Sequence, residues 1–289
     1  MNREDTVRLQ TALLSMGYAA GPIDGIMGPK TICASSQFVL KETKSDGVAK
    51  HAFDLLKPDR GPYVHGIDVS GYQGDIDWKT VSESGMCSFA IVKISEGTTH
   101  KQKSAQRNLD GARAYGIPTA GYHYSHPDTN FHLGLRDAEL EAKNFASHYG
   151  GAPLQPDDLI PWIDFESGGI REASKHEYNV RWLLRFIETV KSELGCRTVG
   201  IYTASWVISS RLRHAGAENL NELAQFPLWW AEYRSETTKE PRKKMKPWAQ
   251  GSESIWQWTG KGRVPGIAEN FCDRNKATAK SIEKLKAYA

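Results

Sequence analysis

The sequence of 289 residues contains no long apolar run, which argues against both a secreted precursor and a membrane-spanning protein. Residues 1–5 are polar, and the segment lacks the apolar core of a signal peptide. No stretch reaches the roughly 20 apolar residues that a membrane span needs. We therefore expect synthesis in the cytoplasm without a signal peptide and no stable membrane insertion. Any work outside the membrane then requires another route.

Cysteine pairs and metal-binding histidine motifs are also missing. The scattered cysteines include no Cys-x-x-Cys pair, which argues against a zinc ribbon or a disulfide scaffold and favours free thiols. The nine histidines include no His-Glu-x-x-His motif. We expect no metal and no cofactor. The four cysteines are Cys33, Cys87, Cys196 and Cys272.

A strong charge of one sign is absent as well. The chain has 37 basic and 34 acidic residues, and its net charge of +3 does not favour nucleic acid as a partner. The basic run at residues 242–246 is a local exception. It is typical of a solvated loop, and the alternative is attraction to an anionic envelope surface.

Tryptophan is absent before Trp78, which suggests that the first part of the chain is a separate unit. Residues 57–62 have the proline and glycine content of a linker. Upstream, apolar residues at helical spacing and two turn clusters predict three short helices, whose small core suits binding better than catalysis. We predict a three-helix domain at residues 1–57, a linker at 58–64 and a larger domain at 65–289.

Short apolar segments alternate with amphipathic ones from residue 66 onward, and the helical patterns include residues 136–149 and 175–194. This alternation predicts an α/β protein with a parallel sheet, and about 225 residues favour a closed β/α (TIM-like) barrel. The later strands have less helix between them, so we expect an irregular barrel. The predicted strands are residues 66–69, 88–94, 119–124, 159–165, 199–202, 228–231 and 255–258.

Two carboxylates lie two residues apart in the apolar segment Trp162-Ile163-Asp164-Phe165-Glu166. In a strand, Asp164 and Glu166 leave the backbone on one face, roughly 6 to 7 Å apart at Cβ. Burial and like charge raise the cost of ionising both, so one should keep its proton near neutral pH, as a general acid must. The alternative is a strand end whose acids simply point into solvent.

Further acids lie at the ends of other predicted strands, where the chemistry of β/α barrels collects. Asp68 and Glu96 follow two early strands, and Asp273 lies near the last one. Acids ringed by flat apolar faces suit a carbohydrate, although core packing is the commoner role of any single aromatic residue. The aromatic candidates are Tyr122, Tyr124, Trp162, Tyr202, Trp229 and Trp256.

An ordered set of motifs over residues 65–275 resembles glycoside hydrolase family 25. The motifs are HGIDVS (65–70), GDIDW (74–78), FAIVKISEG (89–97), GYHY (121–124), DFE (164–166), IYT (201–203), LWWAEY (228–233), IWQW (255–258) and DRN (273–275). That family consists of N-acetylmuramidases, which cleave the β-1,4 bond between N-acetylmuramic acid and N-acetylglucosamine on an irregular β/α barrel.

The resemblance implies residue roles. Glu166 corresponds to the general acid/base, and Asp164, Asp68 and Asp273 complete the acidic site. The Asp-x-Glu pattern resembles substrate-assisted glycosidases, in which Asp164 would orient the 2-acetamido group; a carboxylate nucleophile remains open. One departure is Arg274, which stands where the family usually has an apolar residue. Implied substrate contacts are Glu96, Tyr122, Tyr124, Trp162, Tyr202, Trp229, Trp256 and Gln257.

Residues 1–57 resemble a peptidoglycan-binding domain of the three-helix type through Leu9-Gln10, Leu13, residues 16–18 and 24–31, Ala34 and Phe38. Asp24, Gly25 and Thr31 are the implied wall contacts. Such a module fused to a muramidase without a signal peptide resembles a bacteriophage endolysin. This implies a monomer that binds bacterial peptidoglycan, export through a holin, and action on the periplasmic or extracellular wall.

Three alternatives remain open at this point. A chitinase-like hydrolase can also use an Asp-x-Glu strand end, and a glucosaminidase would cut the other bond of the same polymer. The third is a non-catalytic wall-binding adaptor on a degenerate barrel, which the joint presence of Asp68, Asp164 and Glu166 disfavours.

Overall fold

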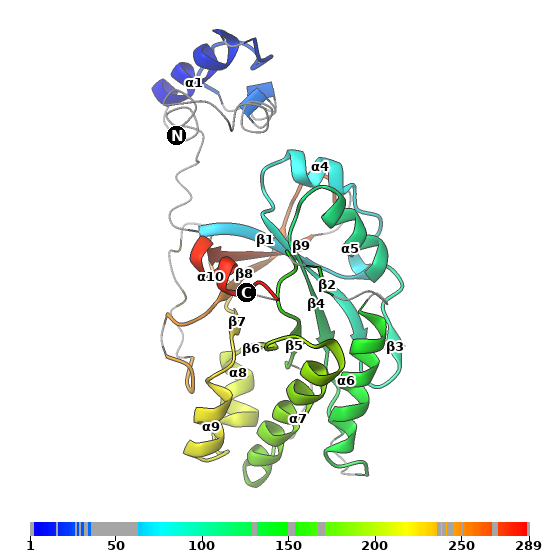
Figure 1. Cartoon of the computed structure of the whole chain (residues 1–289). Coiled ribbons are helices and arrows are strands. Elements are labelled where there is room, and N and C mark those ends of the chain that lie inside the picture. The colour runs from blue at the N-terminus through cyan, green and yellow to red at the C-terminus, as the bar shows by residue number, and fades with distance from the viewer. Residues whose placement is uncertain are drawn as a thin grey trace.

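Eight strands form a closed barrel in the computed structural model (Figure 1). β1 (Tyr63–Val69) pairs with β2 (Phe89–Glu96) on one side and with β9 (Cys272–Thr278) on the other, which closes the ring. β3 (His100–Lys101) only extends the edge of β2. The others are β4 (Thr119–Tyr124), β5 (Trp162–Asp164), β6 (Gly200–Ala204), β7 (Leu228–Ala231) and β8 (Ile255–Gly262). The predicted irregular β/α barrel is confirmed.

The structure describes part of the chain. The described residues are 3–15, 17–26, 28, 30–31, 34–35, 63–128, 132–149, 154–155, 157–166, 171–235, 238, 241, 245–249, 251–267 and 271–287.

The expectation of a wholly parallel sheet needs correction at β9. This strand runs antiparallel to both β8 and β1. Only residues 263–271 connect β8 to β9, and a parallel neighbour would need a crossover of a dozen or more residues. The reversal also places the first residues of β9 beside the last residues of β1.

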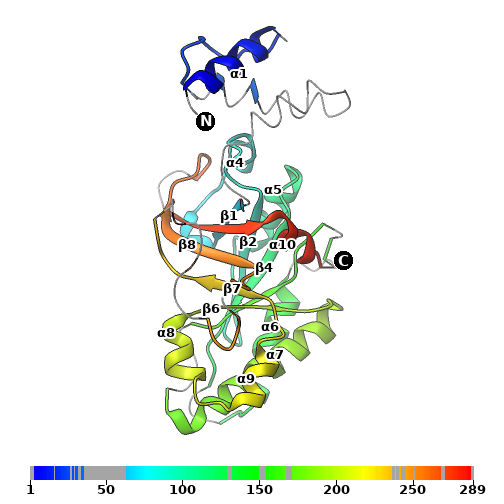
Figure 2. The same cartoon turned by 90° about the vertical axis from the view of Figure 1, so that its left-hand side faces the viewer.

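Helices cover the barrel unevenly, as expected from the shorter helical segments between the later strands. The two long helices lie side by side against the sheet (Figure 1), at nearly the predicted bounds: α6 (Arg136–His148) and α7 (His176–Leu194). Figure 2 shows β8, β7 and β6 in succession along the wall, with short helices beyond β6. The shorter helices are α4 (Trp78–Glu83), α5 (Ala105–Ala114), α8 (Ser205–Val207), α9 (Ala217–Leu223) and α10 (Ala279–Lys284), with single turns η1 (Gly71–Gln73), η2 (Ala173–Lys175) and η3 (Ile208–Leu212).

Alternation along the strands divides the apolar residues into two clusters. Phe89, Ile91, Trp162 and Trp229 belong to the cluster inside the barrel, while the neighbours of these residues pack outward against the helices. The Trp162 ring lies against the backbone of Gly200, where any Cβ would clash with it. The barrel is therefore a filled core whose chemistry must lie at its end.

The N-terminal unit is described only in part. α1 (Arg3–Ser15) and helical residues 30–31 and 34–35 bury a small cluster of Leu9, Leu13, Ala20 and Ala34. The third predicted helix and residues 58–62 of the predicted linker lie outside the described residues. β1 begins at Tyr63, two residues before the predicted start of the larger domain. No helix in the described ranges is long and apolar enough to cross a membrane.

The cysteines that the structure describes agree with the expectation of free thiols. Cys87, Cys196 and Cys272 are buried and unpaired. Cys33 lies outside the described residues.

Candidate active site

Three strand ends bring four carboxyl groups to one end of the barrel. Asp68 lies near the end of β1, Asp164 ends β5, and Glu166 follows β5 by two residues. Asp273 reaches the same end because β9 runs antiparallel, and its Cα pairs directly with that of Asp68. The charges of these groups raise one another's pKa, which shows that they form one cluster.

Asp164 and Glu166 share the inner face of the barrel, as alternation predicts, while Phe165 between them packs in the outer cluster. Burial, and then the charge of Glu166, raise the pKa of Asp164 well above its usual value. Its Oδ1 is buried without a hydrogen-bond partner among the described residues. Burial and the charge of Asp273 likewise raise the pKa of half-buried Glu166. This pair can therefore hold a proton at a pH where ordinary carboxyl groups cannot.

Asp68 is fixed by a polar network from two other strands. Its Oδ2 accepts hydrogen bonds from Gln257 Nε2 at 3.0 Å and Asn275 Nδ2 at 2.8 Å. Tyr202 OH donates to Gln257 Oε1 at 2.9 Å, and Trp229 Nε1 donates to Asn275 Oδ1 at 2.8 Å. Burial raises the pKa of Asp68 well above its usual value, the charge of Asp273 adds to this, and the two amides oppose it. The network fixes the position of this carboxyl group through one of its oxygens.

Asp273 lies at the open side of the cluster. Burial raises its pKa to about 6, against the hydrogen bond that Tyr233 OH donates to Oδ1 at 3.4 Å. A Cβ on Gly260 would come within 3.0 Å of that oxygen and 3.1 Å of the Tyr233 hydroxyl. Sequence reasoning did not single out Tyr233, although it ends the LWWAEY motif and its side chain is exposed.

Aromatic side chains lie beneath the carboxyl groups. Trp229 makes edge contacts with Tyr202 at 4.6 Å and with Tyr122 at 6.1 Å between ring centroids. Trp162 is fully buried and contacts Trp229 from deeper in the barrel, at 5.8 Å. The structure does not bring Trp256 to the site: it is buried in the outer cluster because its neighbour on β8 faces inward.

A second cluster of polar and charged side chains lies at the ends of β2 and β4. Lys93 Nζ contacts Glu96 Oε2 at 2.6 Å, and His126 Nε2 contacts Glu96 Oε1 at 2.7 Å. The Lys93 ammonium also lies 4.7 Å from the centroid of the Tyr124 ring. Partial burial raises the pKa of Glu96, but the hydrogen bonds from Lys93 and His126 outweigh it and hold the pKa below its usual value. Sequence reasoning missed Lys93.

The predicted wall contacts of the N-terminal unit surround Gln10: Asp24 and Gly25 lie in a turn, and Thr31 lies in the helical residues 30–31. Gln10 Nε2 donates to Asp24 Oδ1 at 2.9 Å and to Thr31 Oγ1 at 3.1 Å, and Gln10 Oε1 accepts from Gly25 N at 2.9 Å. Thr31 is buried, and its hydroxyl donates to the carbonyl of Ala20. These bonds fix the shape of the turn, and contact with the wall stays a prediction.

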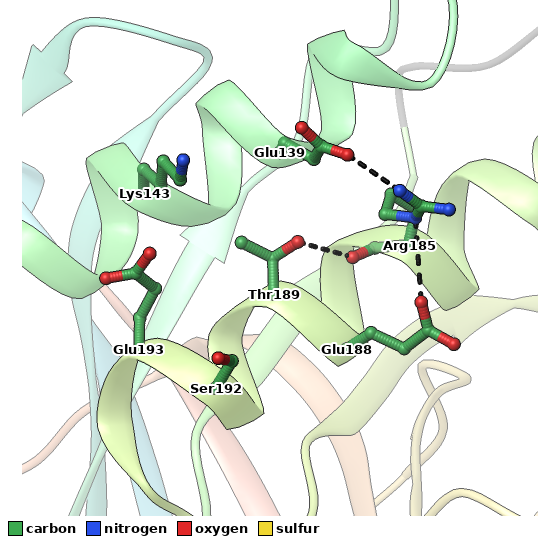
Figure 3. A pocket seen from close by; sticks show the side chains of 7 residues that line it. All are labelled: Glu139, Lys143, Arg185, Glu188, Thr189, Ser192 and Glu193. Atoms are coloured by element: carbon green, nitrogen blue, oxygen red, sulfur yellow. Dashed lines mark hydrogen bonds and ion pairs between the residues drawn. The ribbon is translucent and has the colours of Figure 1, made fainter.

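Two other surface features lie apart from the carboxyl cluster. Figure 3 shows a hollow between α6 and α7 in which Arg185 contacts Glu139 at 2.7 Å and Glu188 at 3.5 Å, as on an ordinary helix–helix surface. In the predicted basic run, Met245 is buried, and residues 242–244 lie outside the described residues.

Comparison with known proteins gives concordant matches over the barrel. The family model described as glycosyl hydrolases family 25 matches residues 67–267. Lysozyme M1 of Streptomyces globisporus is 31% identical over 226 residues, which are 77% of this chain and 70% of that protein. An N,O-diacetylmuramidase of Arthroderma benhamiae is 37% identical over 107 residues, 37% of this chain and 42% of that protein. The crystal structure of a lysozyme from Streptomyces coelicolor superposes with a TM-score of 0.64 at 28% identity, over 78% of this chain and 97% of that chain.

Proposed function

The chain belongs to the glycosyl hydrolases of family 25 and is a lysozyme-type hydrolase of peptidoglycan, and we propose that Glu166 is its proton donor. We further propose that it cleaves the β-1,4 bond between N-acetylmuramic acid and N-acetylglucosamine with retention of configuration. The observation that carries the assignment is the placement of Glu166 beside Asp164 and Asp273, in surroundings that raise its pKa. A general acid needs such a raised pKa to protonate a leaving oxygen near neutral pH.

The first step transfers the proton of Glu166 to the glycosidic oxygen as the bond from that oxygen to the anomeric carbon breaks. The carbonyl oxygen of the substrate's 2-acetamido group attacks the anomeric carbon from the opposite face. Asp164 Oδ1 is buried and without a partner among the described residues, so it is free to accept a hydrogen bond from the acetamido N–H. A negative Asp164 also stabilises the positive charge that develops on the acetamido group.

In the second step a water molecule attacks the anomeric carbon and reopens the bicyclic intermediate. Glu166, now ionised, takes a proton from this water and returns to its starting state. Two inversions at one carbon give net retention. A carboxylate nucleophile would give the same stereochemistry through a glycosyl-enzyme ester, so the two routes differ in the intermediate and not in the product.

The N-terminal unit is proposed to hold the enzyme on its polymeric substrate. Its motifs resemble a peptidoglycan-binding domain, and its described residues bury a small apolar core of their own. On this basis we propose an endolysin-type role for a monomer that reaches the periplasmic or extracellular wall through a holin. A binding module is of little use to an enzyme whose substrate diffuses freely, and the wall does not diffuse.

Digestion of purified peptidoglycan tests the proposal. The products are reduced and analysed by mass spectrometry, which shows the sugar at each new reducing end, and the initial anomer is read by proton NMR. Reducing N-acetylmuramic acid formed as the β anomer is expected. Reducing N-acetylglucosamine would instead mean a glucosaminidase, and cleavage of chitin oligosaccharides at a comparable rate would favour the chitinase alternative. A folded protein that binds the wall and releases no sugar would be an adaptor.

A further inference from the structure

An irregularity in β2 builds a charged pair inside the barrel. Lys93 and Glu96 are three residues apart, so strict alternation would place them on opposite faces. The register with β4 shifts between Lys93, which pairs with Tyr122, and Ser95, which pairs with His123. Such a bulge leaves one extra residue on the strand and re-aims the side chains that follow it. Lys93 and Glu96 therefore share the inner face and form the 2.6 Å contact.

The residues between them confirm that the bulge points outward. Ile94 packs in the outer cluster. Ser95 Oγ lies 2.8 Å from His123 Nδ1, and the His123 ring packs against Phe145 and Phe186 of the helical layer. Lys93 thus faces inward by ordinary alternation with Phe89 and Ile91, and the bulge brings Glu96 to the same face.

Lys93 is a positive charge among several carboxyl groups. Its side chain is only 15% exposed, and its ammonium lies over the ring of Tyr124, whose Cα pairs with Asp164 on the next strand. Its charge lowers the pKa of both Asp164 and Glu166, against the larger effect of burial. Glu96, which contacts both Lys93 and His126, lies outside the carboxyl cluster.

We propose that Lys93, which alternation along β2 places on the inner face and which Glu96 contacts there, is a positioning residue whose positive charge favours the ionised forms of both Asp164 and Glu166. This charge helps to keep Asp164 ionised for the acetamido group, and it limits how far burial raises the pKa of Glu166, the proton donor. The inference rests on the roles given to these two acids under the proposed function. Glu96 acts on them through Lys93, because it balances part of the ammonium charge.

The helical layer holds this arrangement from behind. Glu141 on α6 contacts His123 Nε2 at 2.8 Å and accepts the backbone N–H of His126 at 3.1 Å. Asn144, one turn further on, donates to the carbonyl of Gly97 at 2.8 Å. Burial lowers the pKa of His123 to about 3 and raises that of Glu141 to about 8. The pair carries no net charge at pH 7, so it holds Ser95 and the His126 backbone in place without adding a charge near Lys93.

All titratable groups around Lys93 enter the pH dependence. They are Glu96 on β2, Tyr122, His123, Tyr124 and His126 on β4 and the loop after it, Asp164 and Glu166 on β5 and after it, Glu141 on α6, and Asp68 and Asp273 on the strands across the barrel.

The test is the pH profile of kcat/KM on soluble muropeptides for the full-length chain. Lys93→Met removes a cation, which favours the protonated form of both acids. The profile is expected to be bell-shaped, and both its acidic and its basic limb should therefore move to higher pH, by about one pH unit. Glu96→Gln removes the anion that balances Lys93, so both limbs should move to lower pH. Lys79→Met, an exposed lysine on α4 that pairs with Glu83 at 4.0 Å, is the matched control and should leave the profile in place.

Lys93→Arg keeps the charge and should keep the limbs near their wild-type positions even where kcat falls. A Lys93→Met variant with reduced activity but unmoved limbs would overturn the inference, because a purely structural role predicts that result. If Lys93→Met does not fold, the profile of Glu96→Gln tests the inference. Limbs that stay in place or move to higher pH in Glu96→Gln would overturn it. Glu166→Gln distinguishes a failure of the proposed function from a failure of the inference about Lys93. If Glu166→Gln keeps activity, the proposed roles of Asp164 and Glu166 are wrong. If Glu166→Gln is inactive and the limbs of the Lys93→Met profile do not move, only the role given to Lys93 is wrong.

Discussion

Four carboxyl groups share one end of the barrel, but their immediate surroundings differ. Asp68 is held by two amide donors, whereas Asp164 has a buried oxygen without a partner among the described residues. Asp273 stands beside the exposed Tyr233, and Glu166 is half-buried between Asp164 and Asp273. Identical chemical groups can therefore take different roles, because environment and not residue type sets proton affinity.

The proton donor is tested by Glu166→Gln, which keeps the shape of the side chain and removes its proton. General acid catalysis contributes about 10²- to 10⁴-fold, so we expect a loss of that order in the release of reducing sugar from purified wall. Binding to wall, measured by cosedimentation, should remain. A variant that keeps a substantial fraction of wild-type activity would contradict the assignment.

Buried Glu141 makes a prediction about stability and pH. Its pKa is raised from 4.5 to about 8 in the folded state, so the folded state binds more protons and stability falls as pH rises through that window. His123, lowered from 6.5 to about 3, acts in the opposite direction and only below about pH 6.5. Above about pH 6.5 His123 no longer contributes, and the raised pKa values of Asp68, Asp164 and Glu166 act equally in the wild type and in Glu141→Gln.

Urea denaturation of the wild type and Glu141→Gln at pH 6.5 and 8 measures this effect. The wild type should lose about 1 to 2 kcal/mol relative to the variant over this interval, since one proton corresponds to about 1.4 kcal/mol per pH unit. A stability difference that does not change between the two pH values would show that Glu141 is ionised at both.

Elements at the other end of the barrel serve stability. Asp158, just before β5, accepts from Thr119 Oγ1 of β4 at 2.7 Å and pairs with Arg113 of α5 through both carboxyl oxygens, at 3.1 and 2.7 Å. Its backbone carbonyl accepts from Ala287 N near the C-terminus, at 2.7 Å. One buried carboxylate thus ties a strand, a helix and the last described residues together.

Asp158→Ala should lower the free energy of unfolding by about 3 kcal/mol, because it removes the buried partner of Arg113 and leaves that side chain a longer contact of 3.7 Å with the exposed Asp110. Asp157→Ala is the matched control: that side chain is 88% exposed and lies 4.0 Å from Lys286, so a change within about 0.5 kcal/mol is expected. Urea denaturation measures both. Activity well below the unfolding temperature should be unchanged, and a selective loss of activity would contradict a purely structural role.

The strands differ in how much the sequence reveals about them. Thr119–Tyr124 and Leu228–Ala231 match their predicted bounds, because each is a short apolar run between turn residues. β9 was not among the predicted strands: its residues Asp273, Arg274, Asn275 and Lys276 are polar, and burial by neighbours stabilises it. Lys93 was missed for a related reason: alternation with Phe89 and Ile91 places it on the inner face, but its partner Glu96 reaches that face only through a bulge that depends on pairing with β4.

Register likewise decides which aromatic residues reach the site. Alternation says that Trp256 and Gln257 face opposite ways, but it does not say which of them faces the barrel interior. That choice is made by the pairing of β8 with β7 and β9, which places Gln257 beside Asp68 and Trp256 behind the wall. Acids at strand ends were readable from the sequence because Asp68, Asp164 and Glu166 lie where apolar runs stop.

At the scale of the whole molecule, we expect the barrel to carry out hydrolysis and the N-terminal unit to bind the wall. In the match to the Streptomyces coelicolor lysozyme, 78% of this chain covers 97% of that chain. A barrel of this type can therefore make up nearly the whole of a protein chain. A second contact on the same polymer raises the effective concentration of the catalytic site and can add about 10²- to 10⁴-fold to overall binding. Hydrolysis of a soluble fragment gains nothing from that contact.

Deletion of residues 1–62 should therefore weaken binding to purified wall about 100-fold while leaving kcat/KM on soluble muropeptides within about twofold.

Gln10→Ala in the full-length chain is the companion variant, because it removes the hydrogen bonds that Gln10 makes to Asp24, Gly25 and Thr31. It should weaken wall binding in the same direction without altering the barrel. Cosedimentation with wall and reducing-sugar release from soluble fragments are measured side by side. If wall binding survives both changes, the barrel itself carries the attachment; if both activities fall together in the deletion, the two units are not independent.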